Sequence, residues 1–449
     1  MRFAALLAAV AAVAGCGAPG PPPATPTRFG AELLRRACEA GETAACARLV
    51  PPAEARAPAP CADAAGCRGR DCVAAGYAFE TGRGVTVDLG RARACYERAC
   101  EGGALVGCTN VGLLHHTGRG RPRDDARALA IFRRTCAAGE QLGCTNLGLM
   151  QLHGDGLTAD AAAAVRLLTP ACERGILHAC AALGWLRQTG EGVEQDYAEA
   201  LTLCRDACAG ADALGCTNLG ALYLHGRGVA RNDGLAVELF RYGCDHGDPR
   251  GCTNLGVAAM HGRGVAADPR RAAELYRRGC DGGDGLGCTN LGFLHERGRG
   301  VARDLVVAAE LYRRACDRRD LVGCTNLGIL HEQGRGVAQD HGAAAALYRI
   351  TCEHGQVEGC ASLALLLDEG RGVLRDLAGA ARLYGRACDA GVARACNNLG
   401  VMHQHGRGLP RDLARAARLF ETACRRGNPA GCRNLKALED GPARKGDEP

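Results

Sequence analysis

The stretch GCDGGDGLGCTNLGFLHERGRGVARD, residues 279–304, is the unit from which this chain of 449 residues is built. Its two cysteines, eight positions apart, return every 36 residues without insertion or deletion, ten times in all. Strict self-similarity at such a period is typical of a solenoid, in which each repeat packs mainly on its neighbours. The sequence therefore predicts one repeat array over residues 73–432 rather than several globular domains.

The pattern within one repeat predicts two helices. The apolar residues that follow Cys288, such as Leu291, keep helical spacing until Gly298, a residue type that adopts the left-handed conformation common at helix C-termini. Asp304 is then a suitable N-cap for a second helix, whose apolar face continues to Cys316. We call the first of these an A-helix and the second a B-helix. The predicted fold class is an all-α solenoid of αα-hairpins.

Two columns of small residues predict where the helices approach each other. The position of Ala308 in the B-helix is alanine in all ten repeats, and the position of Gly292 in the A-helix is glycine in nearly all. Glycine inside a helix costs roughly 1 kcal/mol relative to alanine, so its recurrence indicates a steric requirement. We expect two helix backbones to pack closely at these two positions.

The N-terminal residues resemble an export signal. Residues 1–15 carry one positive charge, from Arg2, followed by a short apolar run, and the junction before Cys16 resembles a bacterial lipobox. We expect cleavage before Cys16, lipidation of that residue, and an outer-membrane or surface location facing the periplasm or the exterior. The Pro-rich residues 16–28 read as a tether, 29–72 as a divergent cap and linker, and 433–449 as a C-terminal cap and tail.

Charge and composition argue against nucleic acid as a partner. The formal net charge is +6, or +5 without Arg2, with 54 basic residues against 49 acidic ones. Nucleic-acid binders concentrate basic residues on one face, whereas the arginine columns here alternate with aspartate and glutamate. Aromatic residues make up only 4% of the chain, which leaves little material for base stacking.

The cysteines predict disulfides. Twenty of the 28 cysteines form the two repeat columns, and an exported chain keeps such residues oxidised. Each Cys-x7-Cys could close locally, as Cys280 to Cys288, or within a hairpin, as Cys288 to Cys316; we favour the local bond because its turn never varies in length. The column residues are Cys100, Cys108, Cys136, Cys144, Cys172, Cys180, Cys208, Cys216, Cys244, Cys252, Cys280, Cys288, Cys316, Cys324, Cys352, Cys360, Cys388, Cys396, Cys424 and Cys432.

Several cysteines lie outside the columns. Cys38 and Cys46 repeat the column spacing, and Cys72 is expected to pair with Cys61 or Cys67. Cys95 and Cys204 replace core residues of B-helices and read as small buried hydrophobes. Two cysteines eight apart without a fixed histidine are poor zinc spacing, so no metal and no cofactor are predicted.

These motifs resemble a known family. A 36-residue αα-repeat with LG in the A-helix, G-x-G-V-x-x-D in the turn and A-x-x-L-Y in the B-helix is similar to the Sel-one-like repeat (SLR), and the Cys-x7-Cys pair is most similar to the secreted Hcp-type branch. The resemblance implies a right-handed superhelix of disulfide-linked helix pairs, with A-helices on the concave side, and an adaptor function. It also implies an alternative, because Hcp-type members are described as penicillin-binding proteins or β-lactamases.

An asparagine row supplies the candidate ligand-binding residues. An amide offers both a donor and an acceptor, so a row one repeat apart could hold the backbone of an extended peptide, the ligand class we predict. The alternative is that each amide ties its helix to a neighbouring loop. The predicted groove residues are Asn110, Asn146, Asn218, Asn254, Asn290, Asn326 and Asn398.

No catalytic residue is predicted. The only serine, Ser362, lies in the context SLAL, so the S-x-x-K motif of serine β-lactamases is absent, as is H-E-x-x-H. A histidine column, His115, His295, His331 and His403, lies near the ends of A-helices, where we expect a packing role or a favourable interaction with the helix dipole. The leading hypothesis is a lipid-anchored scaffold for peptides or proteins, and the alternative is a penicillin-binding, weakly hydrolytic protein.

Overall fold

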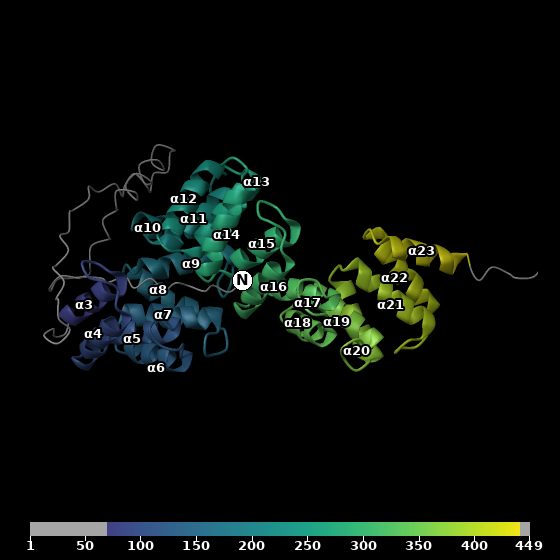
Figure 1. Ribbon diagram of the computed structural model, residues 1–449, viewed down its shortest axis with the longest axis horizontal. Helices are drawn as coiled ribbons and strands as arrows, with labels where there is room; N and C mark the ends of the chain where they lie inside the picture. The colour runs from purple at the N-terminus through teal and green to yellow at the C-terminus, as the bar shows by residue number, and fades with distance from the viewer. Residues whose placement is uncertain (1–69, 441–449) are drawn as a thin grey trace, which may run out of the picture. The chain divides into compact units, whose positions relative to one another are not determined.

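The computed structural model describes residues 70–440, and all regular structure in this range is α-helical (Figure 1). The predicted signal peptide, lipidation of Cys16, tether, divergent cap and Cys38–Cys46 pair lie outside the described residues, as does the tail from residue 441. Within the described range no helix is long and apolar enough to cross a membrane.

Between residues 70 and 440, twenty-one helices alternate between the two predicted types, which confirms the all-α solenoid. The A-helices are α3 (Arg70–Thr81), α5 (Leu105–Thr117), α7 (Gln141–His153), α9 (Leu177–Thr189), α11 (Ala213–His225), α13 (Pro249–His261), α15 (Gly285–Arg297), α17 (Leu321–Gln333), α19 (Val357–Glu369), α21 (Ala393–His405) and α23 (Pro429–Glu439). The B-helices are α4 (Leu89–Glu101), α6 (Asp125–Ala137), α8 (Ala161–Glu173), α10 (Tyr197–Ala209), α12 (Asp233–Asp245), α14 (Pro269–Asp281), α16 (Leu305–Asp317), α18 (His341–Glu353), α20 (Leu377–Asp389) and α22 (Leu413–Arg425).

The predicted helix ends are confirmed at the turn from A-helix to B-helix. Gly298 ends α15 with a φ of 67°, the left-handed conformation that glycine adopts without a Cβ clash. Asp304 caps α16, because its Oδ1 accepts from the backbone N–H groups of Val306 at 2.9 Å and Val307 at 3.0 Å. Equivalent aspartate or asparagine caps precede the other B-helices.

The A-helices begin earlier than we predicted from the sequence. In the repeat that begins with α17, Asp320 is the N-cap and the helix starts at Leu321, so Cys324 lies inside the first turn instead of before it. Cys316 likewise lies within the last turn of α16. The connection between the two helices is therefore only three residues long, and the disulfide joins helix to helix.

The structure has the local disulfide pairing and not the hairpin alternative. Nine pairs join cysteines eight residues apart, with Cα–Cα distances of 4.4 to 4.7 Å, within the normal range for a disulfide. Cys280, Cys288 and Cys72 are also disulfide-bonded, and the expected partners of Cys72, Cys61 and Cys67, lie outside the described residues. Each of these nine pairs links the B-helix of one repeat to the A-helix of the next.

The two small-residue columns face each other, with an aromatic ring between them. All ten alanines of the column of Ala308 are fully buried. A Cβ placed on Gly292 would lie 2.8 Å from Cε1 of Tyr312, and the same overlap arises between Gly256 and Tyr276 at 2.7 Å. The glycine is therefore required chiefly because it accepts the buried ring of the B-helix, a cause more specific than the backbone approach we expected.

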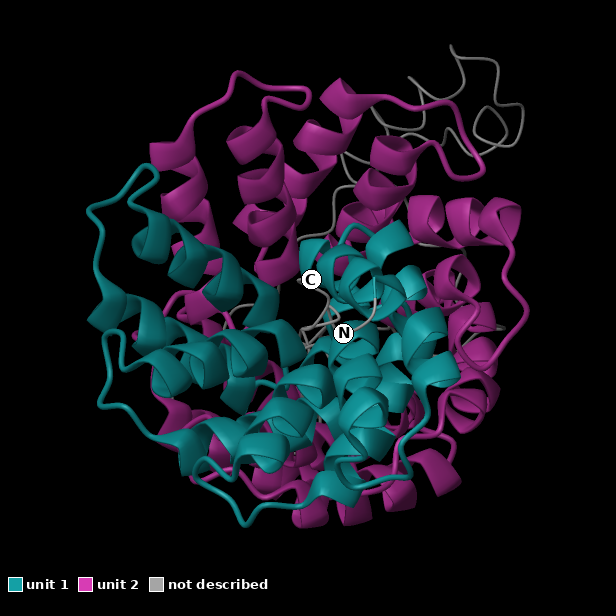
Figure 2. Cartoon of the chain, turned by 90° about the vertical axis from the view of Figure 1, so that its right-hand side faces the viewer, with its two compact units in different colours: residues 1–2, 284–449 teal, residues 3–283 magenta. Residues whose placement is uncertain are grey.

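The described chain divides into two compact units between residues 283 and 284 (Figure 2). In the unit that ends at residue 283, each A-helix from α3 to α11 packs on the next A-helix as well as on its own B-helix. The B-helices of neighbouring repeats contact each other less than this. Within this unit the A-helices therefore lie on the inner side of the stack.

The glycine–ring contact yields a first prediction. Gly292→Ala should lower the free energy of unfolding by about 1 to 3 kcal/mol, because the added methyl overlaps a ring that is buried on all sides. Gly385→Ala in α20 is the matched control. The nearest atom to its new Cβ lies 4.0 Å away, so the substitution should instead stabilise by about 0.5 to 1 kcal/mol. Thermal unfolding with the disulfides intact measures both, and equal effects would contradict the account.

Candidate functional site

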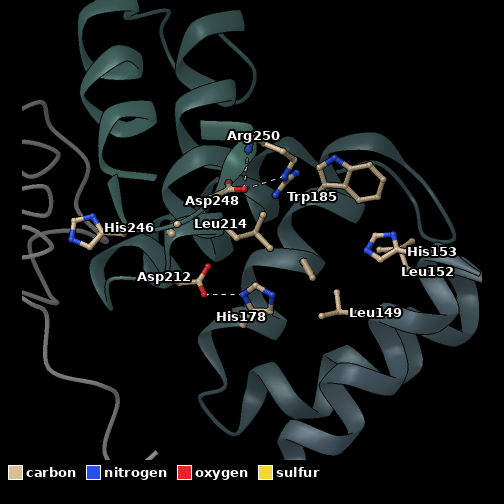
Figure 3. A pocket seen from close by; sticks show the side chains of 13 residues that line it. Leu149, Leu152, His153, His178, Trp185, Asp212, Leu214, His246, Asp248 and Arg250 are labelled. Atoms are coloured by element: carbon tan, nitrogen blue, oxygen red, sulfur yellow. Dashed lines mark hydrogen bonds and ion pairs between the residues drawn. The ribbon is translucent and has the colours of Figure 1, made fainter. Parts of the chain in front are cut away.

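An open hollow on the A-helix side is the candidate site (Figure 3). It encloses about 660 Å³, including solvent at its mouth, and is bordered by α7, α9, α11 and the residues around the start of α13. Its walls are mostly apolar: Leu149 and Leu152 come from α7, Ala182 and Trp185 from α9, and Leu214 from α11. Trp185 is the only tryptophan in the chain.

The buried polar groups of the hollow lie inside disulfide-closed loops. His178 lies between Cys172 and Cys180, Asp212 between Cys208 and Cys216, and Asp248 between Cys244 and Cys252. Each loop joins two helices, and in the second and third loops an aspartate caps the new A-helix: Asp212 accepts from the N–H of Gly215 at 2.8 Å, and Asp248 from that of Arg250 at 3.2 Å. The disulfides and caps thus fix the positions of the polar groups.

His178 and Asp212 form a buried pair that connects two repeats. The Nδ1 atom of His178 lies 3.0 Å from Oδ2 of Asp212, and both residues are more than nine-tenths buried. Burial alone would lower the pKa of His178, but the carboxylate of Asp212 outweighs it and raises the pKa above the ordinary value. The other ring nitrogen, Nε2, is buried without a hydrogen-bond partner.

Asp248 leaves one carboxylate oxygen unsatisfied. Its Oδ1 accepts from the backbone of Arg250, whose Nε also lies 3.5 Å away. Its Oδ2 is buried and has no hydrogen-bond partner, and the whole residue is only 8% exposed. Buried carboxylate oxygens are normally hydrogen-bonded, so this atom is free to accept from a ligand.

In each compact unit a column of apolar residues follows the A-helices, and in the unit that ends at residue 283 this column includes Trp185 of the hollow. The column of Trp185 lies five residues after the second cysteine of each repeat, and from Trp185 onward its members remain partly exposed, with Phe293 at 40%. We name these residues the A-stripe. They are Trp185, Ala221 and Val257 in one unit, and Phe293, Ile329, Leu365 and Val401 in the other.

The predicted asparagine row is divided between buried and partly exposed positions. Asn110, Asn146 and Asn218 are buried, whereas Asn254, Asn290, Asn326 and Asn398 are half-exposed. Three members make bracing contacts. Asn218 donates to the carbonyl of Ala181 in the preceding repeat at 2.9 Å, Asn398 donates to the hydroxyl of Tyr384 at 3.2 Å, and Asn326 bonds to Tyr312. Asn254 and Asn290 remain the best candidates for contact with a ligand.

At two residues of the histidine column, the surroundings disfavour the charged form of the imidazole ring. Burial lowers the pKa of His115, and the positive charge of Arg121 lowers it further. Burial also lowers the pKa of His403. For these two residues the lowered pKa favours the packing alternative over the dipole interaction.

A bracing ladder between repeats escaped the sequence analysis. The hydroxyl of Tyr312 donates to Oε2 of Glu296 at 2.9 Å, and Arg335 of the next repeat binds Oε1 of the same carboxylate at 3.3 Å. Tyr348, Glu332 and Arg371 repeat the arrangement, as do Tyr96, Glu80 and Arg119. The sequence signal was available, because in each case an acid precedes the tyrosine by sixteen residues.

The hollow itself also escaped prediction, because its residues depart from the repeat pattern. Trp185 and His178 occupy columns that hold neither residue type in any other repeat.

Cys204, which replaces the aromatic ring of its B-helix, is fully buried, and burial raises the pKa of its thiol to about 12. Its role is to fill space beside Gly184, as the sequence predicted.

The His178–Asp212 pair yields a second prediction. Because the folded state raises the pKa of His178, the stabilisation by its protonated form is complete below the unfolded pKa and is lost as pH rises through the folded pKa. His178→Gln should therefore cost most at about pH 5.5, roughly 1.5 to 3 kcal/mol for a hydrogen bond to a charged group, and less at about pH 8.5. Thermal melts of both proteins across this range measure the gap, and a gap that widens with pH would refute the pairing.

Comparison with solved structures finds other SLR proteins. A protective antigen of uropathogenic Escherichia coli with an SLR fold is 25% identical, with 92% of this chain and 91% of that chain covered and a TM-score of 0.39. A Sel1 repeat protein of Oxalobacter formigenes is 24% identical, with coverage of 70% and 91% and a TM-score of 0.47. Cysteine rich protein B of Helicobacter pylori is 28% identical, with coverage of 29% and 94% and a TM-score of 0.24. No curated protein matches the chain.

The family itself follows from the repeats. The family model of the Sel1 repeat matches ten successive segments: 72–103, 105–140, 141–176, 177–212, 213–248, 249–284, 285–320, 321–356, 357–392 and 393–428. Each of the segments from 105 onward contains one A-helix and the B-helix that follows it. Counted from residue 73 in steps of 36, the predicted repeats start at 109 and its equivalents, four residues later than the matched segments. With matches over most of its length, the chain belongs to the Sel1 repeat family.

Proposed function

We propose that this protein is an exported, lipid-anchored scaffold whose A-helix side binds an extended segment of a partner protein. Sel1 repeat proteins generally mediate protein–protein interactions. The observation that carries the proposal for this chain is the A-stripe, an apolar column that stays partly exposed while the neighbouring positions of the same helices are buried. Half-exposed apolar columns beside polar amides are suited to an extended chain, whose side chains pack while its backbone hydrogen-bonds.

The many disulfides indicate an oxidising compartment, either periplasmic or extracellular. This supports the export signal read from residues 1–15. Lipidation of Cys16 and anchoring in the outer membrane are part of the proposal, since they rest on the sequence motif alone.

No observation favours the alternative of β-lactam hydrolysis. Ser362 is only 7% exposed, and its Oγ accepts from Nη2 of Arg394 at 3.1 Å. The groups bonded to this serine are a guanidinium, which cannot accept a proton, and the hydroxyl of Tyr348, whose pKa is raised by burial, so neither serves as the base that would activate a nucleophile.

The third prediction tests the binding face by position. A photo-reactive phenylalanine analogue at Phe293, in the A-stripe, should cross-link to a polypeptide of the envelope fraction from the producing cell. The same analogue at Ile350 is the matched control, because that side chain is 42% exposed but lies on the B-helix α18. We expect at least a several-fold higher yield at position 293, and equal yields at both positions would contradict the proposal.

The same assay separates the two roles of the asparagine row. Asn254→Ala with Asn290→Ala should lower the cross-linking yield and leave the melting temperature nearly unchanged. Each lost neutral hydrogen bond would weaken binding by roughly 0.5 to 1.5 kcal/mol. Asn218→Ala should instead lower the melting temperature, because it removes the bond to Ala181. A lowered melting temperature with unchanged cross-linking in the double variant would show that these amides also only brace the repeats.

A further inference from the structure

We infer that the hollow bordered by α7, α9, α11 and α13 receives a basic side chain, lysine or arginine, from the bound partner segment. The inference rests on the proposed function, and it states which type of side chain from the partner segment the hollow takes. Three features carry it: a buried carboxylate oxygen without a donor, a tryptophan face, and apolar walls that suit an aliphatic stem.

The unsatisfied oxygen sets the chemistry of the ligand. Oδ2 of Asp248 can only accept hydrogen bonds, because the ionised carboxylate has no proton to donate. It is buried without a partner, while Oδ1 of the same group is already used by the backbone of Arg250. A ligand that enters the hollow must bring an N–H or O–H group to this atom, and a cationic N–H forms the stronger, charge-assisted bond.

The walls match the rest of a basic side chain. Leu149, Leu152 and Leu214 line the hollow beside Trp185, and Figure 3 shows these side chains grouped around the same space as Asp248. Lysine and arginine pack their methylene stems on apolar surface while the charged end reaches a polar group. Tryptophan provides the most favourable aromatic face for a cation.

The charges around the hollow favour a cation over an anion. Asp212 and Asp248 both line the hollow with carboxylates. These two groups would repel a carboxylate ligand. The opposing positive groups are Arg250, which already lies against Asp248, and His178 when it is protonated. His153 from α7 and His246 at the end of α12 complete the titratable groups that line it. With His178 neutral and bonded through Nδ1–H to Asp212, its Nε2 becomes a second acceptor for the ligand.

Trp185 supplies the reporter for the test. In ¹⁵N-labelled full-length protein the indole N–H of this single tryptophan gives one resonance. We would titrate the protein with N-acetyl-lysine methylamide, and in parallel with the norleucine analogue, which keeps the aliphatic stem without the charge, and the glutamate analogue, which carries the opposite charge on a shorter stem. The lysine derivative should shift the resonance at concentrations at least tenfold lower than the other two require, and more strongly at about pH 8.5 than at about pH 5.5.

Asp248→Asn is the decisive variant. Asparagine is an equally good N-cap, so α13 is preserved while the charge is removed. The apparent affinity for the lysine derivative should fall at least tenfold. Asp320→Asn is the control, because Asp320 caps α17 at the equivalent position but bonds to Thr289 at 2.8 Å and lies outside the hollow; it should leave the affinity unchanged. A single sharp indole resonance and an unchanged melting temperature verify that each variant is folded.

The outcomes separate this inference from the proposed function. If norleucine shifts the resonance as strongly as lysine, or if Asp248→Asn has no effect, the hollow selects only apolar groups and the inference falls. If no derivative binds while Phe293 still cross-links, the inference fails and the scaffold function stands. If lysine binds as expected but cross-linking at Phe293 equals that at Ile350, the hollow keeps its chemistry and the proposed binding face is wrong.

Discussion

The disulfide that closes each turn from B-helix to A-helix is the constraint on which the rest of the structure depends. It joins the last turn of one helix to the first turn of the next, with Cα atoms 4.4 Å apart at Cys208–Cys216. On the chain-entropy estimate, a loop this short stabilises by about 2 to 3 kcal/mol. Within each compact unit, where the repeats contact mainly their neighbours, the covalent links at the junctions hold the repeats in register.

The same loops build the candidate site. In five of these loops an acidic residue caps the following A-helix, and Asp212 and Asp248, two of these caps, line the hollow. His178, Asp212 and Asp248 each lie in a loop that a disulfide closes. The disulfides hold these buried polar side chains in place. A flexible turn could withdraw Asp248 to solvent, whereas a closed one cannot, which explains how an unsatisfied carboxylate oxygen persists. The stabilising element and the functional element are thus one structure.

Much of the fold could be predicted because it repeats. The 36-residue period, the glycine exit at Gly298, the cap at Asp304 and the buried alanine column all follow from local rules applied ten times. The start of the A-helix was misplaced, because Gly323, a poor helix former, lies in the first turn after the cap at Asp320 and made this stretch resemble a loop. The steric role of Gly292 required knowing which ring of the B-helix lies opposite.

The candidate site could not be predicted by the same route. Its residues, above all Trp185 and His178, differ from the residues at the same positions of the other repeats. A search for residue types that recur does not find them. Their proximity also depends on four A-helices coming together, and no spacing within one repeat specifies this. The asparagine row shows a different limitation. Its residue type recurs in most repeats, yet the row contains both bracing residues such as Asn218 and partly exposed ones such as Asn254.

The most direct test of this account is hydrogen exchange in a protein that lacks one disulfide. Replacing Cys208 and Cys216 by serine opens the loop that carries Asp212. The account predicts faster exchange in the first turn of α11 and a displaced Trp185 indole resonance, because Asp212 no longer holds His178 beside the hollow. Opening Cys388–Cys396 in the same way should leave both readouts unchanged. If the first variant kept the protection of α11 and the position of the indole resonance, the disulfide would not be what positions the site, and the central claim would be wrong.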